Sequence, residues 1–235
     1  EPSVWKGKRG KGEYKEVKGF RLYLVGTDRI VHLISWHQVQ NEEEFARGLL
    51  KIREAGLIPQ DKVRLCIIGD GAPWIWNKSL EIFPKAKQVL DFYHCSEYIH
   101  AVANAQYGKG TLQAKEWVEA TFTRLFHNNI DDVIRGLKIM QPVSAEAKEQ
   151  IDGVVRYLSK RKEQVNYGSA KRAGYHLGSG PIESANKFIC HTRMKRSGAW
   201  WVKEAGYAML RVRCAIYNGT YEKVFDKYKK NQIPL

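Results

Sequence analysis

Two short, almost continuously apolar runs constrain the fold of this chain more than any other feature of its sequence. Val63–Ile68 and Gln88–Tyr93 each have the length of a buried strand, and Ile75–Phe83 between them has the pattern of a helix. A strand, a helix and a second strand in this order predict two parallel strands, because the connection has to cross over one face of the sheet. The sequence therefore predicts an α/β fold with a mixed sheet flanked by helices.

The segment ahead of these runs predicts an antiparallel hairpin followed by a helix. Val17–Val25 and Ile30–Trp36 are rich in strand formers, and Gly26–Arg29 between them has the composition of a turn. Asn41 then precedes three glutamates and a periodic apolar pattern that stops at Gly56. An N-cap residue, an acidic first turn and a terminal glycine indicate an amphipathic helix.

Residues 97–176 have a helical and strongly charged pattern. The helices predicted here and just before are Ser96–Ala105, Leu112–His127, Ile130–Met140 and Ser144–Val165. Asn129 and Ser144 stand where helix caps are expected, and Gly168–Gly180 is predicted to be a loop. We expect residues 97–176 to form an all-helical insertion in a core built from residues 1–96 and 177–235.

The chain carries a large positive charge, with 39 Lys and Arg against 25 Asp and Glu, a net charge of +14 and a pI near 9.6. Basic residues concentrate in residues 1–21 and 184–213, and neither stretch has the long apolar face of a helix that lies on a membrane. The excess favours a polyanionic partner, with nucleic acid ahead of a membrane surface. A solvated basic face is the alternative.

Cysteine usage and hydropathy predict a cytoplasmic protein. The four cysteines are far apart in the sequence and form no Cys-x-x-Cys pair, which argues against a structural zinc site and against a disulfide framework. No apolar run approaches the roughly 18 residues that a bilayer-spanning helix needs. We therefore expect a soluble, intracellular protein that has no membrane partner.

The stretch Gly178–Ser184 places a carboxylate at the start of a basic helix. Pro181 suits the first helical position, and Glu183 then lies in the first turn, near the positive end of the helix dipole. The helix that follows is rich in Lys and Arg and leads to two adjacent tryptophans, Trp200 and Trp201. Such a carboxylate suits a functional site, although an acidic residue in a first turn is also common in purely structural helices.

Asp70 follows the first apolar run directly and stands between two glycines. In open α/β sheets this edge is where ligands and metals gather, whereas a plain Asp-Gly turn is the alternative. Divalent cations such as Mg²⁺ take oxygen ligands, and phosphodiester chemistry commonly uses a few Asp and Glu carboxylates to hold them. Asp70 and Glu183 suit this use if the fold brings them together.

The order of these motifs resembles a known family. A Gly-Asp-Gly with Asp70 after one strand, Asp91-x-x-His94 after the next, a helical insertion, and Gly-Ser-Gly-Pro-Ile-Glu183-Ser followed by Arg-Met-Lys-Arg-Ser-Gly are similar to the catalytic domain of bacterial insertion-sequence transposases. These are DDE transposases of the Mutator and hAT-like branch, with an RNase H-like fold and an all-helical insertion. The similarity covers about residue 14 to about residue 215.

The resemblance implies an enzyme that uses Mg²⁺ or Mn²⁺ to cleave DNA at the ends of the element and to join the freed 3′ end to target DNA. Asp70 matches the second catalytic aspartate of the family and Glu183 matches its glutamate, so both would bind metal. Double-stranded DNA would be the partner, with a homodimer or larger assembly forming on it. The protein would then be associated with the nucleoid.

Further residues receive roles from the same resemblance. Asp91 and His94 would lie beside the active site, where His94 could orient the scissile phosphate. A strand-end histidine bonded to the backbone is the alternative. The candidate DNA contacts are basic or aromatic residues after Glu183, namely Lys187, Arg193, Lys195, Arg196, Trp200 and Lys203. For Trp200, packing in the core is the alternative. The basic segment Lys6–Gly12 also suits phosphate contacts, with a solvated loop as the alternative.

One departure from the family pattern leaves three alternatives open. The first aspartate of the family lies on a strand upstream of Val17, and no aspartate precedes Asp28 in this sequence. Either the first aspartate lies ahead of Glu1 in a longer chain, or the protein is an inactive, transposase-derived DNA-binding protein. A structure-selective nuclease of the same fold, which cuts strands without joining them, is the third reading.

Overall fold

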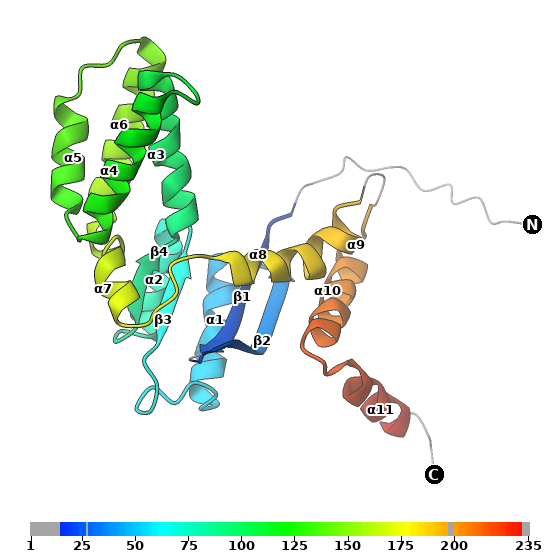
Figure 1. The fold of residues 1–235 in the computed structure, drawn as a ribbon. Coiled ribbons are helices and arrows are strands. Elements are labelled where there is room, and N and C mark those ends of the chain that lie inside the picture. The colour runs from blue at the N-terminus through cyan, green and yellow to red at the C-terminus, as the bar shows by residue number, and fades with distance from the viewer. Residues whose placement is uncertain (1–14, 27, 197–199, 232–235) are drawn as a thin grey trace, which may run out of the picture. The chain divides into compact units, whose positions relative to one another are not determined.

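The computed structural model describes residues 15–26, 28–196 and 200–231. The chain divides into two compact units, which we call unit 1 (Glu1–Arg47 with Pro181–Leu235) and unit 2 (Gly48–Gly180). Figure 1 shows helices and short strands in both units, so the expected α/β class is confirmed.

No helix in the described ranges is long and apolar enough to span a bilayer. The segment Lys6–Gly12 lies outside the described residues.

Unit 1 begins with the predicted antiparallel hairpin. Strand β1 (Val17–Val25) pairs with β2 (Ile30–Val39) in a register that sets Phe20 opposite Trp36.

The helix α1 (Glu42–Glu54) then starts with a capping box. The backbone N–H of Glu44 donates to Oδ1 of Asn41 at 2.8 Å, and the N–H of Asn41 donates to Oε2 of Glu44 at 2.9 Å. The predicted N-cap is therefore confirmed.

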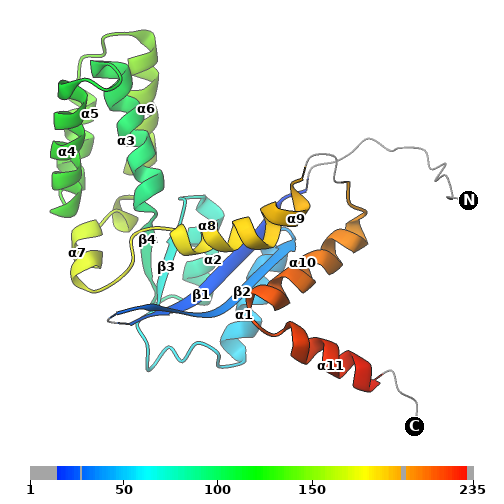
Figure 2. The same cartoon turned by 45° about the vertical axis from the view of Figure 1, so that its right-hand side comes forward.

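The remaining helices of unit 1 are α8 (Gly180–Asn186), a π-helical turn (Lys187–His191), α9 (Thr192–Met194), α10 (Lys203–Tyr217) and α11 (Tyr221–Asn231). Figure 2 shows α8 and α10 against the β1–β2 hairpin. Their contact is a small core of Ala185, Ile189, Cys190, Leu210 and Cys214, with Val17 and Val39 of the sheet packed against it. This core holds the end of α8 and the π-helical turn against the hairpin.

Unit 2 contains the predicted parallel pair. Strand β3 (Cys66–Gly69) pairs with β4 (Lys87–Leu90), and α2 (Pro73–Ile82) forms the connection. The second strand is shorter than the sequence predicts, because Asp91 caps α3 (Phe92–Tyr107) and the helix starts at once. The expected strand end Asp91–His94 is therefore the start of a helix.

The rest of unit 2 is helical. Figure 1 shows α3, α4 (Leu112–Phe126), α5 (Ile130–Ile139) and α6 (Ala145–Ser159) side by side. A 3₁₀ turn (Lys162–Gln164) and α7 (Tyr167–Arg172) follow, so the segment predicted to be a loop begins with a helix. The helices share one hydrophobic core with the strands, which includes the fully buried Val89, Leu90, Ile99, Leu125, Leu158 and Tyr167.

Among the described residues, the strands form two separate pairs, β1–β2 and β3–β4, and not the single mixed sheet that the sequence predicted. Each pair joins strands that are neighbours in the sequence, one through a tight turn and the other through α2. Both pairs were correctly predicted, because each joins consecutive strands whose connection is visible in the sequence.

Candidate functional site

Asp70 lies directly after Gly69, at the carboxyl end of β3, and it is exposed. Its Oδ1 accepts the backbone N–H of Ala72 at 3.0 Å, which closes an Asx turn. Ala72 then leads into α2, which begins with Pro73. Because β3 runs parallel to β4, Asp70 stands at the edge of unit 2 where parallel strands present ligand-binding loops.

Two side chains at the end of α6 hold the backbone of the Asp70 loop. The hydroxyl of Tyr157 donates to the carbonyl of Asp70 at 2.9 Å. The guanidinium of Arg161 donates to the carbonyl of Gly71 through Nε at 2.9 Å and through Nη2 at 2.5 Å. It also lies 4.2 Å from the centre of the Tyr157 ring. We call Tyr157 and Arg161 the α6 clamp.

Asp91 has a structural role in the observed geometry. The residue is buried, and its Oδ1 accepts the backbone N–H groups of Tyr93 at 2.7 Å and His94 at 3.1 Å. Its Oδ2 accepts the N–H of Ser179 at 2.8 Å. Both oxygens are therefore used, one to cap α3 and one to hold the segment that leads to α8, which leaves Asp91 poorly suited to bind a metal ion.

His94 lies in the first turn of α3, and its side chain is about 38% exposed. Its Nδ1 is 3.5 Å from Oε2 of Glu97, and its ring makes edge contacts with Tyr98 at 5.3 Å and with Tyr157 at 6.4 Å between ring centres. Tyr157 thus contacts both the Asp70 loop and His94, and it brings these two predicted site residues into one local cluster.

The sequence did not reveal the α6 clamp. Tyr157 and Arg161 lie 87 and 90 residues from the carbonyls that they bind. In the sequence both read as ordinary parts of a charged amphipathic helix and its end. The glycine after Asp70 was the one signal in the sequence, because glycine often stands where the backbone has a positive φ or another group comes close. Gly71 does have a φ of +95°, but the sequence did not indicate which side chains would approach it.

Glu183 lies exposed in the first turn of α8, as predicted. Two contacts in unit 1 anchor this helix to the hairpin. Nη1 of Arg21 donates to the carbonyl of Pro181 at 2.8 Å, and Nε2 of His37 lies 2.8 Å from Oδ1 of Asn186. Glu183 belongs to unit 1 and Asp70 to unit 2.

A π-helical turn interrupts the basic helix after Glu183. The carbonyl of Lys187 accepts the backbone N–H of Thr192 and also its hydroxyl, the latter at 2.8 Å. The carbonyl of Phe188 accepts a hydrogen bond from the guanidinium of Arg213. Arg213 also stacks over the Phe188 ring at 4.0 Å. Arg213 therefore helps to join α10 to this helix.

The predicted DNA contacts are all exposed, as binding to a phosphate backbone requires. They are Lys187, Arg193, Lys195, Arg196, Trp200 and Lys203. Trp200 is 81% exposed, which argues against the alternative that it packs in the core. Residues 197–199, between Arg196 and Trp200, lie outside the described residues.

Within the described ranges, no cluster of three or more His, Cys, Asp or Glu side chains could hold a metal ion. Mg²⁺ does not need such a cluster, because it is usually bound by one or two carboxylates together with water and substrate phosphates. The exposed carboxylate of Asp70, at the end of β3, has the donor chemistry for that kind of site. The residues present are therefore compatible with Mg²⁺ or Mn²⁺.

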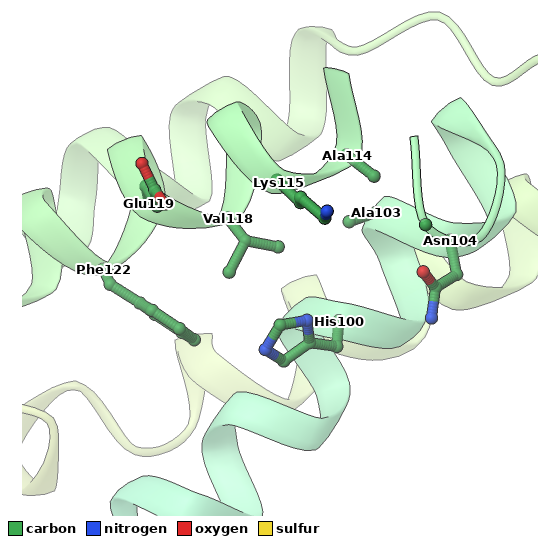
Figure 3. Close-up of a pocket in the computed structure, with 9 residues that line it drawn as sticks. His100, Ala103, Asn104, Ala114, Lys115, Val118, Glu119 and Phe122 are labelled. Carbon is green, nitrogen blue, oxygen red and sulfur yellow. The ribbon is translucent and has the colours of Figure 1, made fainter. Parts of the chain in front are cut away.

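A separate cavity of about 390 Å³ lies between α3 and α4. Figure 3 shows His100 of α3 and Lys115 and Phe122 of α4 around it. The ring of His100 packs against Phe122 at 5.7 Å between ring centres.

Comparison with protein families gave one result. The sequence model of the uncharacterised protein family UPF0236 matches residues 54–231, which includes all of α2 to α11. No curated protein and no solved structure matches the chain. Since the matched residues are most of its length, the chain belongs to the UPF0236 family.

Proposed function

We propose that the protein is the catalytic domain of a DDE-class DNA transposase, with an RNase H-like core and a helical insertion. It would cleave DNA strands at the ends of an insertion sequence and join the freed 3′ end to target DNA. Asp70 and Glu183 would both bind the Mg²⁺ or Mn²⁺ ions that this chemistry uses. Bound metal would activate the attacking water or hydroxyl and stabilise the leaving oxygen.

The setting of Asp70 carries this proposal. A simple Asp-Gly turn is stabilised by its own local hydrogen bonds. The Asp70 loop makes such a bond, yet it also receives three hydrogen bonds from two side chains about 90 residues away. An exposed carboxylate on a loop held this firmly, at the carboxyl end of a parallel strand, is what a metal-binding site requires.

His94 supports the same reading as a phosphate-orienting residue. Its ring is partly exposed and lies in the cluster with Tyr157, whose hydroxyl binds the Asp70 loop. An imidazole near a metal-bound phosphate can donate a hydrogen bond to a phosphate oxygen. His94 would therefore position the DNA strand and not bind metal.

The exposed basic residues of unit 1 would hold the DNA. Lys187 begins the π-helical turn after α8, Arg193 lies in α9, and Lys203 begins α10. Contacts of this kind bind phosphates without reading the base sequence. Assembly of two or more copies on DNA would follow the resemblance to insertion-sequence transposases.

A strand-transfer assay with a precut, labelled transposon end and Mg²⁺ tests the proposal. We expect Asp70→Asn and Glu183→Gln to abolish joined product while binding to the same DNA stays within about twofold of the wild type. Two matched controls remove equivalent surface carboxylates. Asp61→Asn changes an exposed aspartate of unit 2, and Glu204→Gln changes the first-turn glutamate of α10.

The outcomes separate the candidate functions. Joined product that is lost in Asp70→Asn and Glu183→Gln and kept in both controls supports a transposase. Full activity in either variant would refute the metal-binding role of that carboxylate. Cleavage without joining by the wild type would indicate a nuclease of the same fold, and DNA binding without either reaction would indicate a non-catalytic DNA-binding protein.

A further inference from the structure

We propose that Tyr157 and Arg161, the α6 clamp, are positioning residues that aim the Asp70 carboxylate at its metal ion. The inference rests on the proposed function of Asp70 and adds two residues to it that the sequence did not single out. Neither residue would touch the metal or the DNA. Both would act through the backbone of Asp70 and Gly71.

The clamp fixes two successive carbonyls. Tyr157 holds the carbonyl of Asp70, and Arg161 holds the carbonyl of Gly71 with two N–H groups. A fixed carbonyl fixes the plane of its peptide group, because the peptide bond is rigid. With the peptide planes after Asp70 and after Gly71 both set, the turn around Gly71 can no longer swing, and this limits where the Asp70 side chain can point.

Gly71 shows how closely the clamp approaches the loop. A Cβ atom at this position would lie 2.6 Å from Nε of Arg161, and 2.9 Å from both Oη of Tyr157 and Cδ1 of Leu90. The φ of +95° also excludes most side chains. The loop therefore has the one residue type that lets both clamp side chains reach the backbone.

Tyr157 links the loop to His94 as well. Its ring packs against Tyr98 at 4.5 Å and against His94 at 6.4 Å between ring centres. Its hydroxyl donates to the carbonyl of Asp70 at 2.9 Å, so the same side chain contacts the Asp70 loop and His94. One residue thus orients both the carboxylate and the histidine of the proposed site.

The test compares five variants of the full chain, one of which is Asp70→Asn. Tyr157→Phe removes the hydroxyl and keeps the ring that packs against His94 and Arg161. Arg161→Lys keeps the charge and removes the two-pronged contact with Gly71. The matched controls are Tyr98→Phe, which changes the other tyrosine of the same aromatic stack, and Arg156→Lys, which changes an exposed arginine of α6.

Three quantities that report on the site are measured for each variant, and the melting temperature is a fourth that reports on folding. Mn²⁺ binding is followed by electron paramagnetic resonance of the free ion, without DNA. Hydrogen exchange is followed by mass spectrometry over a peptide that covers residues 69–76. Strand transfer is measured against Mg²⁺ and Mn²⁺ concentration, and the melting temperature shows whether each variant is folded.

We expect both clamp variants to bind Mn²⁺ about 10–100-fold more weakly, the range typical for the loss of a residue that supports a metal ligand. Exchange in residues 69–76 should rise, and strand transfer should fall more in Mg²⁺ than in Mn²⁺, because Mg²⁺ demands nearly ideal octahedral geometry. The two control variants should match the wild type in all three measurements.

Two results would overturn the inference in distinguishable ways. If Asp70→Asn loses Mn²⁺ binding and strand transfer but folded Tyr157→Phe and Arg161→Lys match the wild type, the clamp does not position Asp70. If Asp70→Asn itself leaves Mn²⁺ binding and strand transfer unchanged, the proposed function fails, and the role of the clamp fails with it.

Discussion

The stability of unit 1 should fall in mild acid because of one buried histidine. His37 is 1% exposed on β2, and its ring lies over Gly19 of β1, where an added Cβ would come within 2.2 Å of the ring. Nε2 of His37 bonds to Oδ1 of Asn186 on α8, so this nitrogen carries the proton. Nδ1 is buried and has no hydrogen-bond partner among the described residues. A second proton would therefore place a buried charge and an unpaired N–H in the core.

The size of this loss of stability follows from the pKa of His37, which burial lowers from 6.5 to about 4. Because the unfolded chain takes up the proton first, the contribution of His37 to stability is fully present above pH 6.5 and is lost as the pH falls toward 4. At about 1.36 kcal/mol for each pH unit, the loss is about 3 kcal/mol. This is a large part of the stability of an ordinary domain.

Urea unfolding of the wild type and of His37→Gln at several values between pH 7.5 and pH 4.5 measures this effect. Hydrogen exchange in a peptide that covers residues 181–190 reports on α8 in the same samples. The wild type should lose more unfolding free energy than His37→Gln over this range. His191→Gln, which changes an exposed histidine at the end of the π-helical turn that follows α8, should behave like the wild type. Equal losses in the wild type and in His37→Gln would refute the reasoning.

Three further predictions concern the clamp, the hairpin and the basic surface. Gly71→Ala should weaken Mn²⁺ binding at least as much as Tyr157→Phe, because its Cβ would displace both clamp side chains, and unchanged binding in the titration would contradict this. Asn218→Ala should lower the urea unfolding free energy by about 1–3 kcal/mol, because it leaves the N–H and the C=O of Ser35 unpaired, and a smaller change would show that water replaces them. Arg193→Gln should reduce the slope of log affinity against log salt by about 1 for double-stranded DNA, as measured by fluorescence anisotropy, and an unchanged slope would exclude a phosphate contact there.

Local signals in the sequence predicted the elements of the fold well. The capping box of Asn41, the cap of Ser144 and the apolar run that became β3 each depend on residues that are close together in the chain. Asn129 stands at the expected start of α5, but its side chain makes no capping bond. Asp91 was wrongly assigned to the end of a strand, because an aspartate after an apolar run suits a turn as well as a helix cap. Helix α3 starts at Phe92, directly after Asp91 and four residues before the predicted start at Ser96.

Long-range relations could not be predicted in the same way. The position of Asp70 after a buried strand was visible in the sequence, but its hold by Tyr157 and Arg161 depends on contacts across about 90 residues. The hydrogen bond between His37 and Asn186 could not be predicted either, because these residues are 149 positions apart in the sequence. Hydrophobic periodicity places residues on a face of an element, and it does not specify which distant side chain will meet that face.

The shared core of unit 2 has a consequence for how the helical segment can be used. Leu90 at the end of β4 is fully buried together with residues of α3, α4 and α6. Excising residues 97–176 and closing the gap with a short linker would leave Leu90 and Val89 in water and release the backbone after Asp70 at the same time. The segment is therefore not a detachable module, and a hybrid protein that borrows it must take β3, α2 and β4 with it.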